Sequence, residues 1–217
     1  MRFELRTTDD GSLTVFDHEA GECFKSRHAA RLEAEHVFFG PAVLEHPAYG
    51  KDATFTVLEL GFGLGTNFLH FLSRGYRGNF TSIERDFGGA RFYLEHVEEP
   101  ALAELLAARS LERPGMRAEL VEGDFFAELR LLGEAGYRAH AVLFDPFSPK
   151  ANPDAWTVEL FRLISSVLHP GGRLVTYSVS RGAKDACAAA GLVAEKRKLP
   201  PALRKRSALL AIRSKGG

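Results

Sequence analysis

Residues 55–72 combine a strand-like run, a glycine-rich turn and a helix-like pattern, and this combination constrains the fold most strongly. Gly61, Gly63 and Gly65 follow the apolar run at alternate positions, before apolar residues recur at helical spacing. A strand, a glycine loop and a helix form the opening unit of nucleotide-cofactor folds, because a backbone without Cβ atoms turns sharply and approaches a ligand closely. Glu59, just before the loop, favours a ligand with a positive or hydrogen-bond-donating group over a pyrophosphate. The alternative is a glycine-rich turn that binds nothing.

Strands and helices are predicted to alternate after this unit. The predicted strands are residues 55–60, 80–84, 118–121, 141–144, 173–178, 192–196 and 207–212, and the predicted helices lie near 66–73, 89–108, 124–132, 154–168 and 181–190. Such alternation gives a mostly parallel sheet with helices on both faces. We therefore expect a Rossmann-like α/β fold with seven strands.

The N-terminal residues predict a small extension to this fold. Residues 3–17 alternate around Asp10-Gly11, which indicates a β-hairpin, and residues 29–38 have a helical pattern. We expect an extension over residues 1–45 and a Rossmann-like domain over residues 46–217, which together form effectively one domain.

Composition excludes several classes of protein. Cys23 and Cys187 are the two cysteines and lack metal-ligand spacing, which argues against a zinc site or a disulfide framework. The first residues are too polar for a signal peptide, and no apolar run approaches membrane-spanning length. We expect a cytoplasmic protein without metal or membrane contact.

The zero net charge conceals an uneven distribution. Residues 173–217 hold eleven Lys or Arg against two acids, a net charge of +9, so the remainder has −9. A basic end on an acidic body indicates contact with a polyanion. A solvated basic surface explains the pattern equally well.

Acids follow four successive predicted strands. They are Glu59, Glu84, Asp124 and Asp145. In open α/β sheets the ligand lies outside the carboxyl ends of the strands, so these four side chains are expected to surround one site.

The loop spacing separates two cofactor classes. A dinucleotide site requires G-x-G-x-x-G, whereas this chain has G-x-G-x-G with Thr66 at the last glycine position. Together with Glu59, Gly123-Asp124 and the P-G-G at 170–172, the loop resembles the motifs of class I S-adenosylmethionine-dependent methyltransferases. The resemblance implies that the loop approaches the methionine part, Glu84 the ribose and Asp124 the adenine amine. The cofactor-binding residues predicted in this way are Glu59, Gly61, Gly63, Gly65, Asn67, Glu84, Asp124 and Asp145.

The stretch DPFSPKANPDAW at residues 145–156 narrows this resemblance. It is similar to the methyltransferase half of the bifunctional MnmC enzymes and their stand-alone relatives, and the similarity extends from residues 23–40 to the basic end. That family methylates a 5-aminomethyl group to 5-methylaminomethyl on the wobble (2-thio)uridine of tRNA. The resemblance implies tRNA, through its anticodon stem-loop, as partner, with aminomethyl-generating enzymes upstream.

Two departures from the family pattern are visible. The bifunctional enzymes add a flavin oxidase half, for which 217 residues leave no room, so we expect a stand-alone form that performs the methyl step. The family's glycine-containing basic turn is replaced by residues 196–210, KRKLPPALRKRSALL. This change affects the stretch expected to dock tRNA.

Asp145 is the predicted catalytic residue. Methyl transfer to an amine requires a neutral nitrogen, and a carboxylate beside it accepts a proton and orients the lone pair. The backbone carbonyl of Pro146 is expected to help. The predicted substrate-binding residues are Pro146, Phe147, Lys150, Asn152, Trp156, Tyr177, Lys198, Arg204, Lys205 and Arg206. The final basic residues are expected to bind phosphates. The aromatic residues are expected to stack on a flipped base, but a place in the core explains them equally well, especially Trp156.

Two alternatives remain at this point. One is a methyltransferase of the same fold that acts on a small amine, and the other is a non-catalytic RNA-binding module. A nicotinamide oxidoreductase is disfavoured by Thr66.

Overall fold

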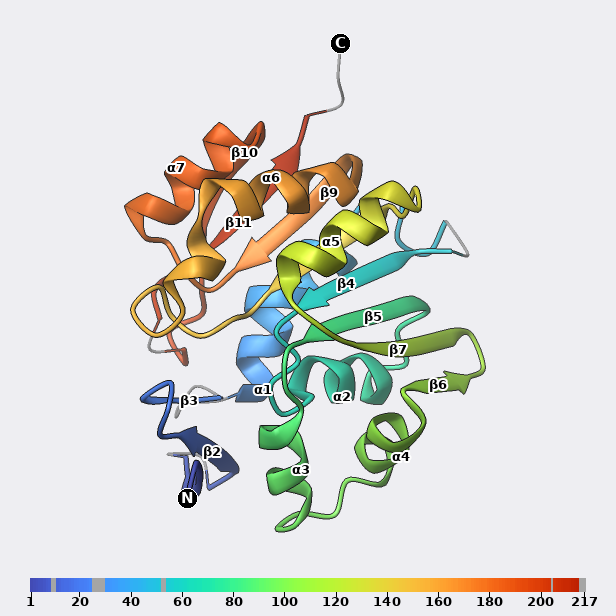
Figure 1. Cartoon of the computed structure of the whole chain (residues 1–217). Helices are drawn as coiled ribbons and strands as arrows, with labels where there is room; N and C mark the ends of the chain where they lie inside the picture. Colours follow the sequence, from blue (N-terminus) through green and yellow to red (C-terminus); the bar gives the residue numbers. More distant parts are fainter. Residues whose placement is uncertain (9–10, 25–29, 52–53, 204, 215–217) are drawn as a thin grey trace.

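A computed structural model describes residues 1–8, 11–24, 30–51, 54–203 and 205–214. Its centre is an eight-stranded sheet with the order β10-β11-β9-β8-β4-β5-β7-β6 (Figure 1). Neighbours from β9 to β7 pair in parallel, whereas β10, β11 and β6 pair antiparallel. The strands are β4 (Thr56–Leu60), β5 (Gly78–Glu84), β6 (Ser110–Arg113), β7 (Met116–Glu122), β8 (Ala139–Phe144), β9 (Leu168–Thr176), β10 (Leu192–Lys198) and β11 (Ser207–Arg213).

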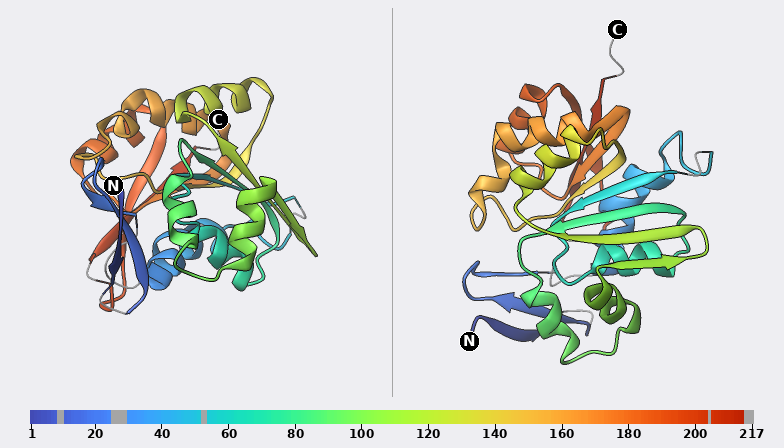
Figure 2. Two further views of the ribbon diagram at one scale, coloured as in Figure 1. Left: turned by 60° about the horizontal axis from the view of Figure 1, so that its bottom comes forward. Right: turned by 45° about the vertical axis from the view of Figure 1, so that its right-hand side comes forward.

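Helices cover both faces of this sheet (Figure 2), which confirms the predicted α/β class. One layer contains α1 (Ala30–Glu33), the π-helix η1 (Ala34–Leu44), α2 (Thr66–Ser73), α3 (Gly88–Leu94) and α4 (Pro100–Ala108). The other contains α5 (Phe125–Glu134), α6 (Val158–Val167) and α7 (Arg181–Ala189), preceded by the short η2 (Pro153–Trp156). Val57 joins the first core and Leu58 the second, because successive side chains of a strand point to opposite faces.

The predicted N-terminal hairpin is confirmed and is larger than expected. β1 (Phe3–Thr7) pairs antiparallel with β2 (Leu13–Asp17), and β3 (Glu22–Cys23) adds a third strand. Asp10 of the expected turn lies outside the described residues. In Figure 1 this small sheet lies beside α3, below the carboxyl edge of the large sheet.

Three predicted elements need correction. The helix expected over residues 89–108 is broken into α3 and α4, because Pro100 lacks an amide donor and starts a new helix. The sheet has eight strands instead of seven, since Pro114-Gly115 closes a hairpin between β6 and β7. β9 begins at Leu168, earlier than expected.

The helical pattern expected at residues 29–38 continues further than predicted. Residue 29 lies outside the described part, and α1 leads into η1, which ends at Leu44. η1 contacts β8, β9, β11 and α2. The division at residue 45 therefore stays a prediction. Within the part of the chain that the structure describes, no helix has the length and apolar character to cross a membrane.

His46 makes the stability of the fold sensitive to acid. Its side chain is buried beside Phe55 and His140, and Nδ1 accepts a hydrogen bond from the amide of Ala48 at 3.1 Å. Burial, followed by the charge of Arg173, lowers the pKa of His46 to about 4.

The unfolded chain, with an ordinary histidine pKa, binds more protons than the folded chain between about pH 6.5 and 4. The unfolding free energy is therefore expected to fall by about 3 kcal/mol as pH decreases through this window. Urea denaturation of wild type and His46→Phe at several pH values measures it. An equal pH dependence in both proteins contradicts the role of His46.

Candidate functional site

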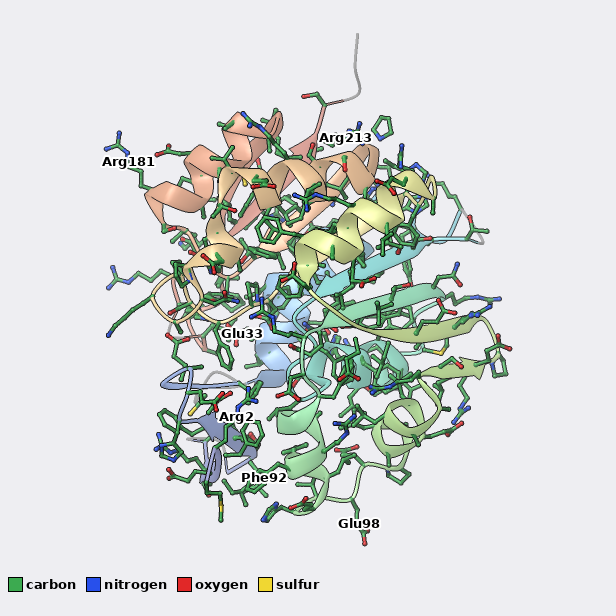
Figure 3. The ribbon with its side chains drawn as sticks, viewed as in Figure 1. Arg2, Glu33, Phe92, Glu98, Arg181 and Arg213 are labelled. Atoms are coloured by element: carbon green, nitrogen blue, oxygen red, sulfur yellow. The ribbon has the colours of Figure 1, made fainter. Side chains whose placement is uncertain are left out.

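A cavity of about 530 Å³ opens at the carboxyl ends of β4, β5, β7 and β8. This is the edge at which the chain moves from one side of β4 to the other, where open α/β sheets bind ligands. Its walls include the glycine loop, the loops after β5, β7 and β8, and the N-terminal sheet. Glu33 of α1, the start of η1, Tyr177 and Lys205 complete them. Figure 3 shows Arg2 and Glu33 on the same side of the molecule, where this sheet meets the large one.

The glycine loop is held against the turn at Asp145. Gly61 has φ +99°, and a Cβ there would lie 2.7 Å from the backbone oxygen of Asp145. The amide of Asp145 donates to the carbonyl of Leu60 at 2.9 Å, and the amide of Gly61 donates to that of Ile83 at 3.0 Å. Glycine is therefore required at position 61 by both conformation and space. Gly63, with φ +56°, lines the cavity.

Glu59 is fully buried behind this loop and does not line the cavity. Its carboxylate accepts hydrogen bonds from Asn67 Nδ2 at 2.9 Å and Ser82 Oγ at 2.6 Å. Burial raises the pKa of Glu59 to about 7. The prediction that Glu59 contacts the ligand therefore needs correction. Its hydrogen-bond partners are inside the protein, and it supports the start of α2. Asn67 is buried and lies at the cavity wall.

Glu84 faces the cavity at the end of β5. Its carboxylate accepts from the amide of Gly63 at 3.1 Å and from that of Arg85 at 2.9 Å. Burial raises the pKa of Glu84 despite these hydrogen bonds. The side chain thus fixes the glycine loop and keeps acceptor capacity for a ligand hydroxyl.

Asp124 caps α5 and faces the same cavity. One oxygen accepts from the amides of Phe126 and Ala127, and the other pairs with Arg85 Nη2 at 2.9 Å. Burial acts to raise its pKa, but these hydrogen bonds outweigh burial and the pKa is lowered. Arg85 is largely exposed, so this ion pair is weak and open to exchange for a ligand.

Asp145 lies at the cavity wall after β8. No hydrogen bond to its carboxylate comes from the described side chains. Burial first, and then the charge of Glu33, raises the pKa of Asp145 well above its usual range, while Lys205 opposes the shift. The carbonyl of Pro146 accepts a hydrogen bond from the hydroxyl of Tyr177 at 2.9 Å. This carbonyl therefore already has one partner within the protein.

The N-terminal sheet supplies site residues that the sequence prediction missed. Glu22 of β3 accepts from the amide of Ser148 at 3.0 Å and also from its hydroxyl, which clamps the loop after Asp145. Phe24 contacts Phe147, with ring centroids 5.0 Å apart. The similarity to the MnmC family begins at Cys23, so it covered Phe24 but gave no signal for Glu22.

The predicted substrate residues divide into two groups. Those that line the cavity with Asp145 are Pro146, Phe147, Asn152, Tyr177 and Lys205, and those that do not are Lys150, Trp156, Lys198 and Arg206. Arg204 lies outside the described residues.

Trp156 is packed behind the site instead of facing it. Its Nε1 donates to the carbonyl of Phe147 at 3.0 Å, and its ring lies against Phe144 and Tyr177. The side chain of Trp156 therefore does not face a base, as predicted, but supports the Asp145–Phe147 turn from behind.

This edge of the sheet fits S-adenosylmethionine. Gly63 lies at the cavity wall with the Glu84 carboxylate beside it, and Asp124 lies after the neighbouring strand β7, at the start of α5. Acceptor oxygens suit ribose hydroxyls and an adenine amine. Among the described residues, no group of His, Cys, Asp or Glu side chains is arranged to hold a metal ion.

Comparisons with known proteins agree with this geometry. A family model described as "S-adenosyl-L-methionine-dependent methyltransferase" matches residues 93–214. The "tRNA 5-methylaminomethyl-2-thiouridine biosynthesis bifunctional protein MnmC" of Ralstonia nicotianae is 30% identical, over 91% of this chain and 33% of that protein. The protein of the same name from Thiobacillus denitrificans is 30% identical over 82% of this chain and 32% of its own length. The chain thus spans about a third of the length of these relatives.

Two solved structures share this fold. MnmC2 from Aquifex aeolicus superposes with a TM-score of 0.78 at 26% identity, covering 99% of this chain and 71% of that one. Spermidine synthase from Thermotoga maritima has a TM-score of 0.64 at 16% identity, covering 99% and 70%, a likeness in fold alone.

Proposed function

We propose that this chain, which belongs to the family of S-adenosyl-L-methionine-dependent methyltransferases, methylates the 5-aminomethyl group of the wobble (2-thio)uridine of tRNA. The similarity to MnmC proteins over most of the chain supports this acceptor, as does the likeness to MnmC2. The single observation on which the proposal depends is the position of Asp145, which lines the cavity and whose backbone packs against Gly61 of the glycine loop. Binding through the anticodon stem-loop, and supply of the aminomethyl group by an upstream enzyme, belong to the same proposal.

The cavity wall suits an acceptor that arrives as a cation. Among the described residues that line it, the charged side chains are mostly acidic, and the basic ones are Arg2, Arg85 and Lys205. The acids are Asp17, Glu19, Glu22, Glu33, Glu84, Asp86, Asp124, Asp145 and Asp154. An alkylamine is roughly one part in a thousand neutral at pH 7, which costs about 4 kcal/mol. The site must therefore both attract the ammonium form and remove a proton from it.

Asp145 is proposed to perform the second task. The cofactor supplies a methyl group on a positively charged sulfur, and its transfer to nitrogen leaves a neutral thioether. A carboxylate whose pKa is raised accepts the ammonium proton more readily than an ordinary aspartate. The carboxylic acid formed in this step still has a carbonyl oxygen, which accepts a hydrogen bond from a remaining N–H and directs the lone pair into the cavity. Tyr177 fixes the turn through the carbonyl of Pro146.

Transfer of labelled methyl from S-adenosylmethionine to tRNA tests the function. The tRNA is taken from cells that lack the modification, and its nucleosides are analysed by mass spectrometry. Methylaminomethyl uridine in the digest is the expected product. Intact cofactor binding without label in tRNA would overturn the tRNA acceptor and favour a small amine.

Lys198 and Arg206 are proposed to contact tRNA phosphates. Both are exposed, and the amide of Leu199, next to Lys198, donates to the carbonyl of Arg206 at 3.1 Å. The logarithm of the tRNA binding constant falls as the logarithm of the salt concentration rises. Each phosphate contact that is lost makes this slope shallower by about 0.7–0.9. Lys198→Ala/Arg206→Ala is therefore expected to weaken tRNA binding and reduce the slope by about 1.5.

Lys51→Ala is the matched control for this variant, because Lys51 is exposed near the opposite end of β4. Filter binding at several salt concentrations measures all three proteins. An unchanged slope in the double variant would place the phosphate contacts elsewhere.

A further inference from the structure

The sequence predicted that Lys205 contacts tRNA phosphates on the outside of the protein. Its amino group points into the cavity instead. Its Nζ lies 2.6 Å from Glu33 Oε1 and 4.1 Å from the centroid of the Tyr177 ring. The same charge acts on the Asp145 carboxyl. All four residues line the cavity. Lys205 therefore occupies a compartment made by the Glu33 carboxylate and the face of the Tyr177 ring, with Asp145 on the same cavity wall.

This compartment has the chemistry of a receptor for an alkylammonium group. The face of an aromatic ring attracts an ammonium ion, and a partly desolvated carboxylate strengthens the attraction. The side chain of Glu33 is 13% exposed, whereas that of Lys205 is 41% exposed. The Tyr177 hydroxyl donates a hydrogen bond to the carbonyl of Pro146, and this bond fixes the Tyr177 ring. Glu33 is thus more enclosed than the lysine that it binds, and the Tyr177 hydroxyl is anchored to the protein.

The aminomethyl group of the proposed acceptor has the same chemistry as the end of a lysine side chain. Both are primary alkylammonium groups at neutral pH. Asp145, the residue proposed to take the proton, lines the same cavity as Lys205 and is within reach of its charge. An acceptor amine that is held between Asp145 and Glu33 therefore competes with Lys205 for the position beside Glu33.

We propose that Glu33, Tyr177 and Asp145 form the binding subsite for the acceptor ammonium group, and that Lys205 fills this subsite until the acceptor displaces it. The identity of the acceptor rests on the proposed function. Lys205 was predicted from the sequence to bind phosphate. In this proposal it does so only after displacement, when it joins Lys198 and Arg206 on the outside.

Displacement gives the site a means of selecting its acceptor. A tethered side chain competes at high effective concentration, so a free small amine binds weakly. A polyanionic acceptor instead offers a phosphate to the lysine that it displaces, which offsets the lost contact with Glu33. The subsite therefore favours an amine that is attached to a nucleic acid.

Calorimetric titration with 5-aminomethyluridine, in the presence of S-adenosylhomocysteine, tests this proposal without measuring methyl transfer. Lys205→Ala is expected to bind the nucleoside about tenfold or more tightly than wild type, because the tethered competitor is removed. Lys205→Arg keeps a cation in the subsite and is expected to bind as weakly as wild type. Lys205→Ala/Glu33→Gln is expected to lose the gain, and uridine is expected to show none.

The controls separate this result from other causes. Lys51→Ala is expected to match wild type, and thermal unfolding of each variant shows that it is folded. Equal or weaker nucleoside binding by Lys205→Ala overturns the proposal, because Lys205 would then be part of the receptor. A gain in nucleoside binding without methyl transfer to tRNA would leave the subsite intact and overturn only the tRNA acceptor.

Discussion

Replacing Asp145 with alanine is expected to lower kcat for methyl transfer by about three orders of magnitude. The variant loses both the proton acceptor and the group that orients the amine. Cofactor affinity is expected to stay within about threefold of wild type. The contacts between the turn and the glycine loop are made by backbone atoms, and alanine keeps them. Single-turnover kinetics and calorimetry with S-adenosylmethionine measure the two quantities separately.

Asp185 provides the matched control for this variant. It is an exposed acid on α7 and does not line the cavity. Asp185→Ala is expected to change kcat by less than about threefold. Asp145→Asn keeps an oxygen that orients the amine but accepts no proton, so it is expected to fall between alanine and wild type. Activity of Asp145→Ala within about tenfold of wild type would remove the proposed role.

The parts of the site that follow local pattern were predictable from the sequence. Strand ends in a parallel sheet meet at one edge, so Glu84, Asp124 and Asp145 were expected to face one cavity, and they do. Glu59 shows the limit of this reasoning. It follows the same strand-end pattern, but Ser82, 23 residues away, provides a buried partner that no local pattern reveals.

Residues from the chain termini were not predictable in the same way. Glu22 meets Ser148 across 126 residues, and Lys205 meets Glu33 across 172. Charge alone assigned Lys205 to an outer basic surface, because a sequence gives no direction to a side chain in an irregular segment. The break at Pro100 and the hairpin at Pro114-Gly115 had local signals that the apolar periodicity outweighed.

Gly61→Ala is expected to disrupt the fold and the site together. A residue with φ +99° is strained unless it is glycine, and the new Cβ would lie 2.7 Å from the backbone oxygen of Asp145. Backbone atoms in a packed sheet cannot move aside cheaply. We expect a loss of about 2–4 kcal/mol in unfolding free energy from strain and overpacking combined. Relief of the clash would shift the Asp145 turn, so kcat is expected to fall by about a hundredfold.

Gly191→Ala separates the two causes. Gly191 also has positive φ, at +74°, but a Cβ there meets no atom within 4 Å, and the residue lies between α7 and β10, away from the cavity. This control is expected to lose about 1 kcal/mol of stability and to keep its activity. Urea denaturation and methyl transfer, measured at a temperature where both variants are folded, compare them. If Gly61→Ala matched Gly191→Ala in both measurements, close contact between the loop and the Asp145 turn would not control catalysis. A selective loss in Gly61→Ala would show that the glycine loop positions the proposed catalytic carboxylate as well as the cofactor.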